Sequence, residues 1–378
     1  MFKNKLGFGL MRLPQTDEND WASVDMEETV KMIDYFMEKG LTHFDTAYSY
    51  HHGNSEKAFK EAVVQKYPRD AYTVSDKMPV WLVKENADYQ KFFDEQLERC
   101  GVDFFDLYFL HALDEKGYTD SVEFGGFEFL KKIKAEGKAK SIGFSYHAAA
   151  DFLDQILENH PEVDYVLLQI NYADWESEAV ESRRCYEAAV KHNVSVLVME
   201  PIKGGSLANV PADAEKLFKE YHPDMSAASW AIRFAASLEN VVCVLSGMSN
   251  FEQMADNVSY MENFTPLNDE EREIIRKVTA IINENTAIPC TACNYCLKDC
   301  PKNIPIPKYF SLYNNQKQFG LTFLQIAYYT DLINSRGKPA DCIECGKCEK
   351  LCPQHILIIN DLKEVASVFE TAMKESSE

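Results

Sequence analysis

The chain has 378 residues, of which 46% are hydrophobic, and its formal net charge is −21. This length and composition predict a folded protein with a large core and exclude a disordered chain. Because a chain this acidic repels phosphate backbones, we expect no nucleic-acid partner. The N-terminal segment MFKNKLGFGLMRLP lacks the apolar core of a signal peptide, and no run reaches about 18 apolar residues. We therefore expect a cytoplasmic protein without a membrane segment.

Short apolar strands alternate with amphipathic helices along the first 265 residues. Strands are expected at 6–9, 42–47, 72–77, 105–111, 140–145, 164–170, 194–200 and 241–247. Helices are expected at 26–39, 55–66, 86–100, 124–136, 147–159, 176–192, in two short pieces up to about 237, and at 250–262. Continuous Val/Ile/Leu-rich runs are typical of strands buried on both faces, so these eight units predict an α/β fold, a (β/α)8 TIM barrel.

A doubly wound open sheet is the structural alternative to the barrel. That fold usually shows a Gly-x-Gly-x-x-Gly turn after its first strand. Here Gly7-Phe8-Gly9 continues as Leu10-Met11-Arg12, without the third glycine. The barrel is therefore the favoured interpretation.

The strand–helix alternation stops near residue 265, where we expect the barrel domain (1–265) to end. The segment 266–285 predicts a connecting helix, capped by Asn268 with Glu271 three residues later. Prolines and cysteines cluster beyond it. We expect residues 286–378 to form a small α+β ferredoxin-like domain with a helical insert.

Eight of the eleven cysteines lie in two runs of identical spacing, each followed by proline. Cytosolic cysteines clustered in this way predict metal ligands rather than disulfides. The spacing is that of bacterial ferredoxins with two [4Fe–4S] clusters, in which the fourth cysteine of each run binds the other cluster. One cluster is therefore assigned to Cys290, Cys293, Cys296 and Cys352, and the other to Cys342, Cys345, Cys348 and Cys300.

Zinc is the competing interpretation of these runs. Zinc sites use four ligands as two pairs, which two complete four-cysteine runs followed by proline do not match. The remaining cysteines, Cys100, Cys185 and Cys243, are expected to be buried packing residues.

Four ionisable residues follow three consecutive strands of the predicted barrel. Asp45 and Tyr50 come after the second strand, Lys77 ends the third and His111 ends the fourth. Barrel enzymes place their catalytic groups at these carboxyl ends. Each residue alone has an ordinary structural explanation, but the four together predict an active site.

The segment GLTHFDTAYSYHHGNSEKAFKEAV (40–63) resembles the strand-2 signature of the aldo/keto reductase family. The resemblance continues in DLYFLH, IGFSYH, LLQINY and SGMSNFEQMADN, and CPKNIPIPKYFSLYN resembles a ferredoxin-fused branch of that family. It implies that Tyr50 donates a proton to a substrate carbonyl, and that Lys77 lowers the pKa of that phenol. Asp45 would hold Lys77, and His111 would orient the carbonyl oxygen or help proton transfer.

The resemblance also implies a site for NADP(H) or NAD(H). Its carboxamide would be held by Ser145 and Gln169, with Tyr172 stacking nearby and with Tyr146 where the family often has Asn. The pyrophosphate loop would be Gly204, Gly205, Ser206 and Leu207. The adenosine side would be Gly247, Ser249, Asn250, Gln253 and Asn257, at a helix N-terminus.

The choice between the two nicotinamide cofactors stays open at this point. Family members that prefer NADPH often carry Arg or Lys after strand 8 to bind the 2′-phosphate. None occurs between Ser246 and Asn268, and Lys203 is the available substitute.

Three functions are compatible with the sequence. The first is reduction of a small aldehyde or ketone by a nicotinamide cofactor, with clusters that are structural or exchange electrons with a ferredoxin or another electron-transfer protein. The second passes electrons from ferredoxin through the clusters to the substrate, which requires a converter such as a flavin because each cluster passes one electron and hydride carries two. The third is a non-catalytic redox sensor, which the four retained active-site residues disfavour. The loop 112–123 and Trp175 are expected to contribute to substrate specificity.

Overall fold

The computed structural model describes residues 2–17, 20–178, 180–284, 286–290, 292, 294–352 and 354–375. Contacts divide the chain into two compact units. The first contains residues 1–175, 180–202 and 228–268, and the second contains 176–179, 203–227 and 269–378.

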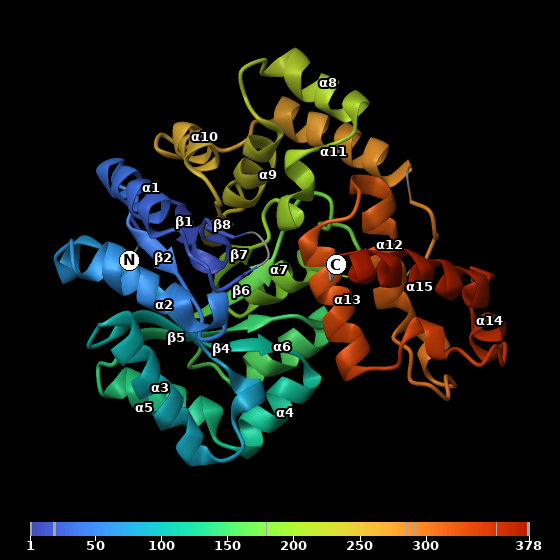
Figure 1. Ribbon diagram of the computed structural model, residues 1–378, viewed down its shortest axis with the longest axis horizontal. Helices are drawn as coiled ribbons and strands as arrows, with labels where there is room; N and C mark the ends of the chain where they lie inside the picture. Colours follow the sequence, from blue (N-terminus) through green and yellow to red (C-terminus); the bar gives the residue numbers. More distant parts are fainter. Residues whose placement is uncertain are drawn as a thin grey trace. The chain divides into compact units, whose positions relative to one another are not determined.

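The first unit is a closed barrel of parallel strands in the order β1 to β8, with β1 also paired to β8 (Figure 1). The predicted (β/α)8 barrel is therefore confirmed. The strands are β1 (Leu6–Gly9), β2 (His43–Asp45), β3 (Thr73–Met78), β4 (Phe105–Leu113), β5 (Ala139–Tyr146), β6 (Tyr165–Gln169), β7 (Ser195–Met199) and β8 (Val241–Gly247).

Helices surround the strands in Figure 1 and cover their outer faces. The helices that follow the strands of the barrel are α1 (Met26–Glu38), α2 (Asn54–Phe59), α3 (Asn86–Cys100), α4 (Glu115–Glu123), α5 (Gly126–Ala135), α6 (Ala150–Asn159), α7 (Ser182–Lys191), α9 (Ala227–Ala236) and α10 (Phe251–Met261). Nearly all of them were expected from the helical spacing of apolar residues.

Helix α3 shows how the sequence builds one of these elements. A capping box of Glu85 and Asp88 begins the helix, and Gly101, with φ of 69°, ends it. Its buried face repeats at helical spacing, with Tyr89, Phe92, Phe93, Gln96 and Cys100 turned toward the core. The amide of Gln96 and the thiol of Cys100 thus lie in a face that is otherwise aromatic.

Residues 112–123 differ from the prediction of a loop. Helix α4 occupies Glu115–Glu123, and the Asp114 side chain caps it by accepting a hydrogen bond from the Gly117 amide at 2.8 Å. The helix is short and polar and contains a glycine, so its apolar pattern was too weak to predict it.

The described residues of the second unit form helices and turns without a strand, so the strand part of the predicted α+β ferredoxin-like domain is not found there. Closely spaced cysteines and prolines leave no extended run that could form a ladder. The helices are α8 (Ala212–Tyr221), α11 (Asp269–Glu284), α12 (Ile306–Phe319), α13 (Phe323–Ser335), α14 (Lys347–Leu351) and α15 (Ile358–Glu375).

A pair and a group of three packed helices organise this unit. Helix α11, the predicted connecting helix, packs against α8, and α12 packs against α13 and α15. The core of the group of three is aromatic, and the rings of Tyr329 and Phe369 stack at 4.7 Å. Among the described residues of the whole chain, no helix is long and apolar enough to span a membrane.

Candidate active site and cysteine centre

A buried ion pair joins the ends of two neighbouring strands at the mouth of the barrel. The Lys77 ammonium donates to Asp45 Oδ2 at 2.6 Å and to the carbonyl oxygen of Thr46 at 2.7 Å. Ser75 donates its hydroxyl to the other oxygen of Asp45, also at 2.6 Å. Charges that are removed from water need such partners, and this arrangement supplies them on both sides of the pair.

Tyr50 and His111 complete the predicted group of four. The Tyr50 ring centre lies 4.9 Å from the Lys77 ammonium, and the rings of Tyr50 and His111 meet edge to face at 5.9 Å and 80°. The structure therefore brings together four residues that the sequence spreads over residues 45–111. Sequence reasoning missed Trp81, whose ring lies 5.2 Å from His111 and which is 44% exposed. An aromatic residue four positions after Lys77 was the available signal.

The charge states of these residues follow from burial and from the ion pair. Burial raises the pKa of Tyr50 and outweighs the nearby Lys77 ammonium, which acts in the predicted, lowering direction. Burial would lower the pKa of Lys77, but Asp45 and Tyr50 raise it on balance. Burial, together with Lys77, holds the pKa of His111 well below its usual value. At neutral pH the site therefore contains a protonated phenol, an ammonium ion and a neutral imidazole.

The turn that carries Tyr50 has an unusual backbone. His51 and His52 follow with φ of 50° and 53°, in the left-handed region that favours glycine, and Gly53 has φ of 86°. The buried His51 ring holds this turn, because its Nδ1 donates to the Trp21 carbonyl oxygen at 2.7 Å. The surrounding contacts thus fix a conformation that the isolated chain would avoid.

The residues predicted for the nicotinamide carboxamide lie at the ends of β5 and β6. Ser145 accepts a hydrogen bond from the Ala112 amide at 2.6 Å, and Gln169 donates to Asp174 at 3.2 Å. Tyr172 is buried, with its ring 6.2 Å from that of Phe234. Nearby, Tyr146 donates its hydroxyl to the Ala149 carbonyl oxygen at 2.7 Å.

The predicted adenosine-side residues form the turn from β8 into α10. Asn250 caps the helix by accepting from the Gln253 amide at 2.9 Å, and the Gln253 side chain accepts from the Ser249 amide at 2.8 Å. Further along the helix, Asn257 donates to Ser246 at 3.0 Å. These hydrogen bonds link the turn to the first two turns of the helix.

Two charged residues beside this turn were missed because they lie far away in the sequence. Glu28 of α1 accepts a hydrogen bond from the Phe251 amide at 2.9 Å and pairs with Lys31 at 3.2 Å. Arg12 lies against Gly247, where an added Cβ would come within 3.1 Å of its Cδ atom. The turn after β8 therefore meets an anion and a cation from the first 30 residues.

The predicted pyrophosphate loop belongs to the second unit. Gly204 and Gly205 have φ of 65° and 103°, whereas Ser206 and Leu207 are buried. A Cβ at Gly204 would lie 2.3 Å from Leu324 of α13, so glycine is required there for two reasons.

Two cavities lie among the cysteines of the second unit. The first is lined by Cys300, Cys342, Cys345 and Cys348, and the second by Cys290, Cys296 and Cys352. Each cavity thus takes cysteines from both runs, and Ile306 lines both. Cys293 lies outside the described residues. Thiol groups that converge on an apolar cavity suit an iron–sulfur cluster.

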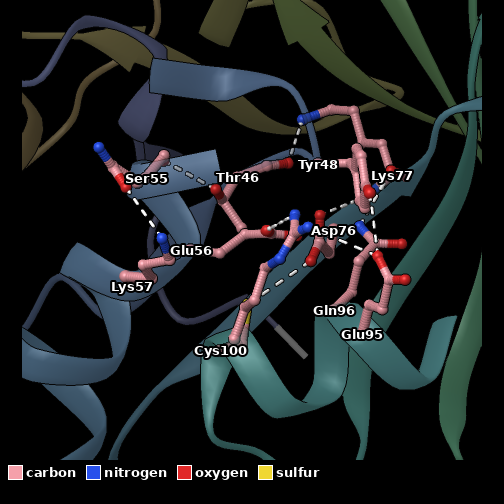
Figure 2. Close-up of polar contacts among 12 residues, drawn as sticks. Thr46, Tyr48, Ser55, Glu56, Lys57, Asp76, Lys77, Glu95, Gln96 and Cys100 are labelled. Atoms are coloured by element: carbon pink, nitrogen blue, oxygen red, sulfur yellow. Dashed lines mark hydrogen bonds and ion pairs between the residues drawn. The ribbon is translucent and has the colours of Figure 1, made fainter. Parts of the chain in front are cut away.

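A second polar cluster lies outside the barrel, between β3 and the helices α2 and α3 (Figure 2). Ligand atoms of Glu56, Asp76 and Cys100 lie within 4.8 Å of one another, and all three residues are fully buried. Burial raises the pKa of Glu56, and it raises those of Asp76 and Cys100 well above their usual values. Because acidic groups that retain protons bind cations poorly, and Arg99 already pairs with Glu56 at 3.0 Å, this cluster is not suited to a metal ion.

The fold and the four-residue site define a known class of enzyme. The model of the aldo/keto reductase family matches residues 5–280, and the chain belongs to that family of oxidoreductases. A 4Fe-4S dicluster domain matches residues 289–357. The chain is therefore an aldo/keto reductase barrel followed by an iron–sulfur domain.

Particular relatives are distant. The 9,11-endoperoxide prostaglandin H2 reductase of Trypanosoma cruzi is 25% identical over 53% of this chain and 66% of its own length. The L-galactose dehydrogenase of Arabidopsis thaliana is 25% identical over 73% of this chain and 90% of its own. A Klebsiella pneumoniae aldo/keto reductase in complex with NADP and acetate shares the fold with a TM-score of 0.59 and 18% identity, over 73% of this chain and 91% of its own.

Proposed function

We propose that this protein reduces a small aldehyde or ketone with a nicotinamide cofactor, and that Tyr50 is the proton donor. The observation that carries the proposal is the position of the Lys77 ammonium between two side chains. It lies 2.6 Å from Asp45 Oδ2 and 4.9 Å from the centre of the Tyr50 ring. Family membership, and a Klebsiella relative in complex with NADP, support the cofactor. In this proposal the barrel (1–265) binds the substrate, and residues 286–378 hold the clusters.

The bound nicotinamide would supply hydride to the carbonyl carbon. Tyr50 would donate its hydroxyl proton to the carbonyl oxygen, and the Lys77 ammonium would stabilise the phenolate that remains. Asp45 would keep Lys77 charged and fixed. His111 Nδ1 is buried without a hydrogen-bond partner among the described residues, so in this proposal the neutral ring would carry its proton on Nε2. That Nε2 proton is available to orient the carbonyl oxygen.

Replacement of Tyr50 by Phe tests this assignment. We expect carbonyl reduction to fall at least about a thousandfold, while the cluster absorption and the thermal midpoint stay unchanged. Undiminished reduction by Tyr50→Phe would overturn the proposal.

We further propose that the cysteine cavities hold two [4Fe–4S] clusters, each bound by cysteines from both runs. The shared lining of each cavity supports this assignment. Such clusters pass single electrons, and the partner would be a ferredoxin or another electron-transfer protein. Electron exchange between clusters and nicotinamide would need a two-electron converter such as a flavin.

An anaerobic titration distinguishes a shared electron path from separate functions. The purified protein is first checked for flavin, and NADH or NADPH is then added while the visible absorption of the clusters is followed. If the clusters have a structural or partner-facing role, dithionite bleaches them but the nicotinamide does not. Bleaching by the nicotinamide in a flavin-containing preparation would favour the ferredoxin-linked reductase instead.

A further inference from the structure

One buried amide on helix α3 connects the two strands that carry Lys77 and His111. Gln96 Nε2 donates to the Lys77 carbonyl oxygen at 3.1 Å, and Gln96 Oε1 accepts a short hydrogen bond from the Tyr108 hydroxyl. Gln96 and Tyr108 are both fully buried. Figure 2 shows Gln96 reaching from α3 toward the strand that carries Lys77.

An amide at this position is unexpected on packing grounds alone. The neighbouring residues on the buried face of α3 are Tyr89, Phe92 and Phe93, and an apolar residue would fit such a row. A buried amide costs free energy unless its donor and acceptor are both used. Here the amide nitrogen binds the Lys77 carbonyl oxygen of β3 and also the Glu56 side chain, and the amide oxygen binds Tyr108 of β4. The amide therefore holds the Lys77 backbone rather than adding hydrophobic contact.

The same helix also holds the turn that carries Tyr50. Arg99 pairs with Glu56 at 3.0 Å, and its guanidinium carbon lies 4.3 Å from the Tyr48 ring centre. The Tyr48 hydroxyl donates to Glu95 of α3 at 2.9 Å. Tyr48 is two residues before Tyr50, so α3 contacts the supports of both residues that the proposed reaction brings together.

We propose that Gln96 is a positioning residue, which fixes the Lys77 ammonium beside the Tyr50 ring by holding the Lys77 carbonyl oxygen against α3. This inference rests on the proposed role of Tyr50 as proton donor. Gln96 touches neither substrate nor cofactor in this role. It acts because the attraction between an ammonium ion and a phenolate weakens as their distance grows, and small displacements in an active site reduce rates strongly.

The test is a direct titration of Tyr50 together with steady-state kinetics. Protein labelled with 3-fluorotyrosine is titrated with base by fluorine NMR, and the Tyr50 resonance is assigned by its absence in Tyr50→Phe. In Gln96→Met, which keeps the length but loses the donor, we expect the Tyr50 midpoint to rise by about one pH unit. We also expect kcat to fall roughly tenfold or more, with the KM for nicotinamide unchanged.

Gln90→Met is the matched control, because Gln90 lies on the same helix and pairs with Asp94 rather than with a strand. Tyr108→Phe removes a single hydroxyl and serves if Gln96→Met does not fold; a smaller shift in the same direction is expected. A Tyr50 midpoint that is the same in Gln96→Met, Tyr108→Phe and Gln90→Met would overturn the inference. The fluorine titration gives this answer even if Tyr50→Phe proves active, so failure of the proposed function and failure of the positioning role are distinguishable.

Discussion

The carboxylate of Glu28 accepts a hydrogen bond from the backbone amide of Phe251, at 2.9 Å, at the N-terminus of α10. A helix N-terminus otherwise attracts anions, and in the proposed site it would face the adenosine side of the cofactor. Here a carboxylate already occupies it, and a 2′-phosphate placed nearby would meet a like charge. Lys31, at 3.2 Å from Glu28, and Arg12, which lies against Gly247, bring positive charge to this turn, but the Glu28 carboxylate is the group that holds the Phe251 amide.

We therefore expect the protein to prefer NADH, and Glu28→Gln to raise kcat/KM for NADPH about tenfold relative to NADH, which corresponds to about 1.4 kcal/mol. The ratio of the two kcat/KM values measures this. Glu27→Gln removes the same charge from an exposed neighbour and should leave the ratio unchanged. A wild-type preference for NADPH that persists in Glu28→Gln would contradict the prediction.

Asp45→Asn should impair the reaction through Lys77. The buried ammonium loses its counter-charge, so the pKa of Lys77, which Asp45 helps to raise, falls. We expect kcat to drop on the order of a hundredfold, and the alkaline limb of the kcat profile to move to lower pH. Ser75→Ala removes a hydrogen bond to Asp45 and a longer one to His43, leaves the Asp45–Lys77 ion pair intact, and should have a much smaller effect. An unchanged alkaline limb in Asp45→Asn would show that the ion pair does not govern the reaction.

The pH profile should contain no ionisation of His111 near neutrality. Burial and the neighbouring Lys77 hold the pKa of this imidazole well below its usual value, so the ring is neutral throughout that range. We expect kcat/KM to be constant from pH about 8 to about 6. Stability behaves differently: a base whose pKa is lowered by folding makes the folded state less stable as pH falls below about 6.5. An acid limb of kcat/KM near pH 6.5 that disappears in His111→Gln would refute the prediction that His111 is neutral.

Asp76 should make stability depend on pH in the opposite direction from an ordinary surface carboxyl. Its pKa is raised well above the usual value by burial and by Glu56, so folding favours the protonated form. The contribution of protonated Asp76 to the free energy of unfolding is complete below pH about 4. It is lost as pH rises toward the folded-state pKa, at about 1.4 kcal/mol per pH unit. Asp76→Asn should flatten this fall, measured as the thermal midpoint against pH. Asp94→Asn, at an exposed position, is the control, and equal slopes in all three proteins would exclude this role for Asp76.

The shared lining of the cysteine cavities predicts crossed ligation. Cys300→Ser should perturb the same cluster as Cys342→Ser, because both residues line the first cavity. In each variant we expect roughly half of the iron to be lost or labile and one set of electron paramagnetic resonance signals to disappear. If Cys300→Ser instead matched Cys290→Ser, each run would bind its own cluster.

The barrel could be predicted because its strands and helices repeat strongly. Strand ends such as Lys77 and His111 could likewise be placed at one mouth from topology alone. The contacts of Glu28 and Arg12 with the turn after β8 could not, because closure of the barrel brings β1 and α1 beside β8 and α10. Spacing within one segment carries no information on such pairs.

The sequence also failed where local patterns were weak or were overridden. Helix α4 has few apolar residues, so its cap at Asp114 was the main signal and was missed. The left-handed backbone of His51 and His52 could not be predicted from residue type, because histidine rarely adopts it and tertiary contacts impose it. The hydrogen bond from Gln96 to the Lys77 carbonyl likewise depends on how α3 packs, which the helical pattern alone does not specify.

Strand β3 presents Lys77 to the barrel mouth and Asp76 to the helix layer, because successive side chains point to opposite faces. An engineer can therefore alter the environment of the lysine from outside the barrel, at Asp76 or Gln96. A library restricted to that layer would vary rate and working pH while every residue that faces the mouth stayed the same. Selectivity and turnover would then be separate targets, addressed from opposite faces of one strand.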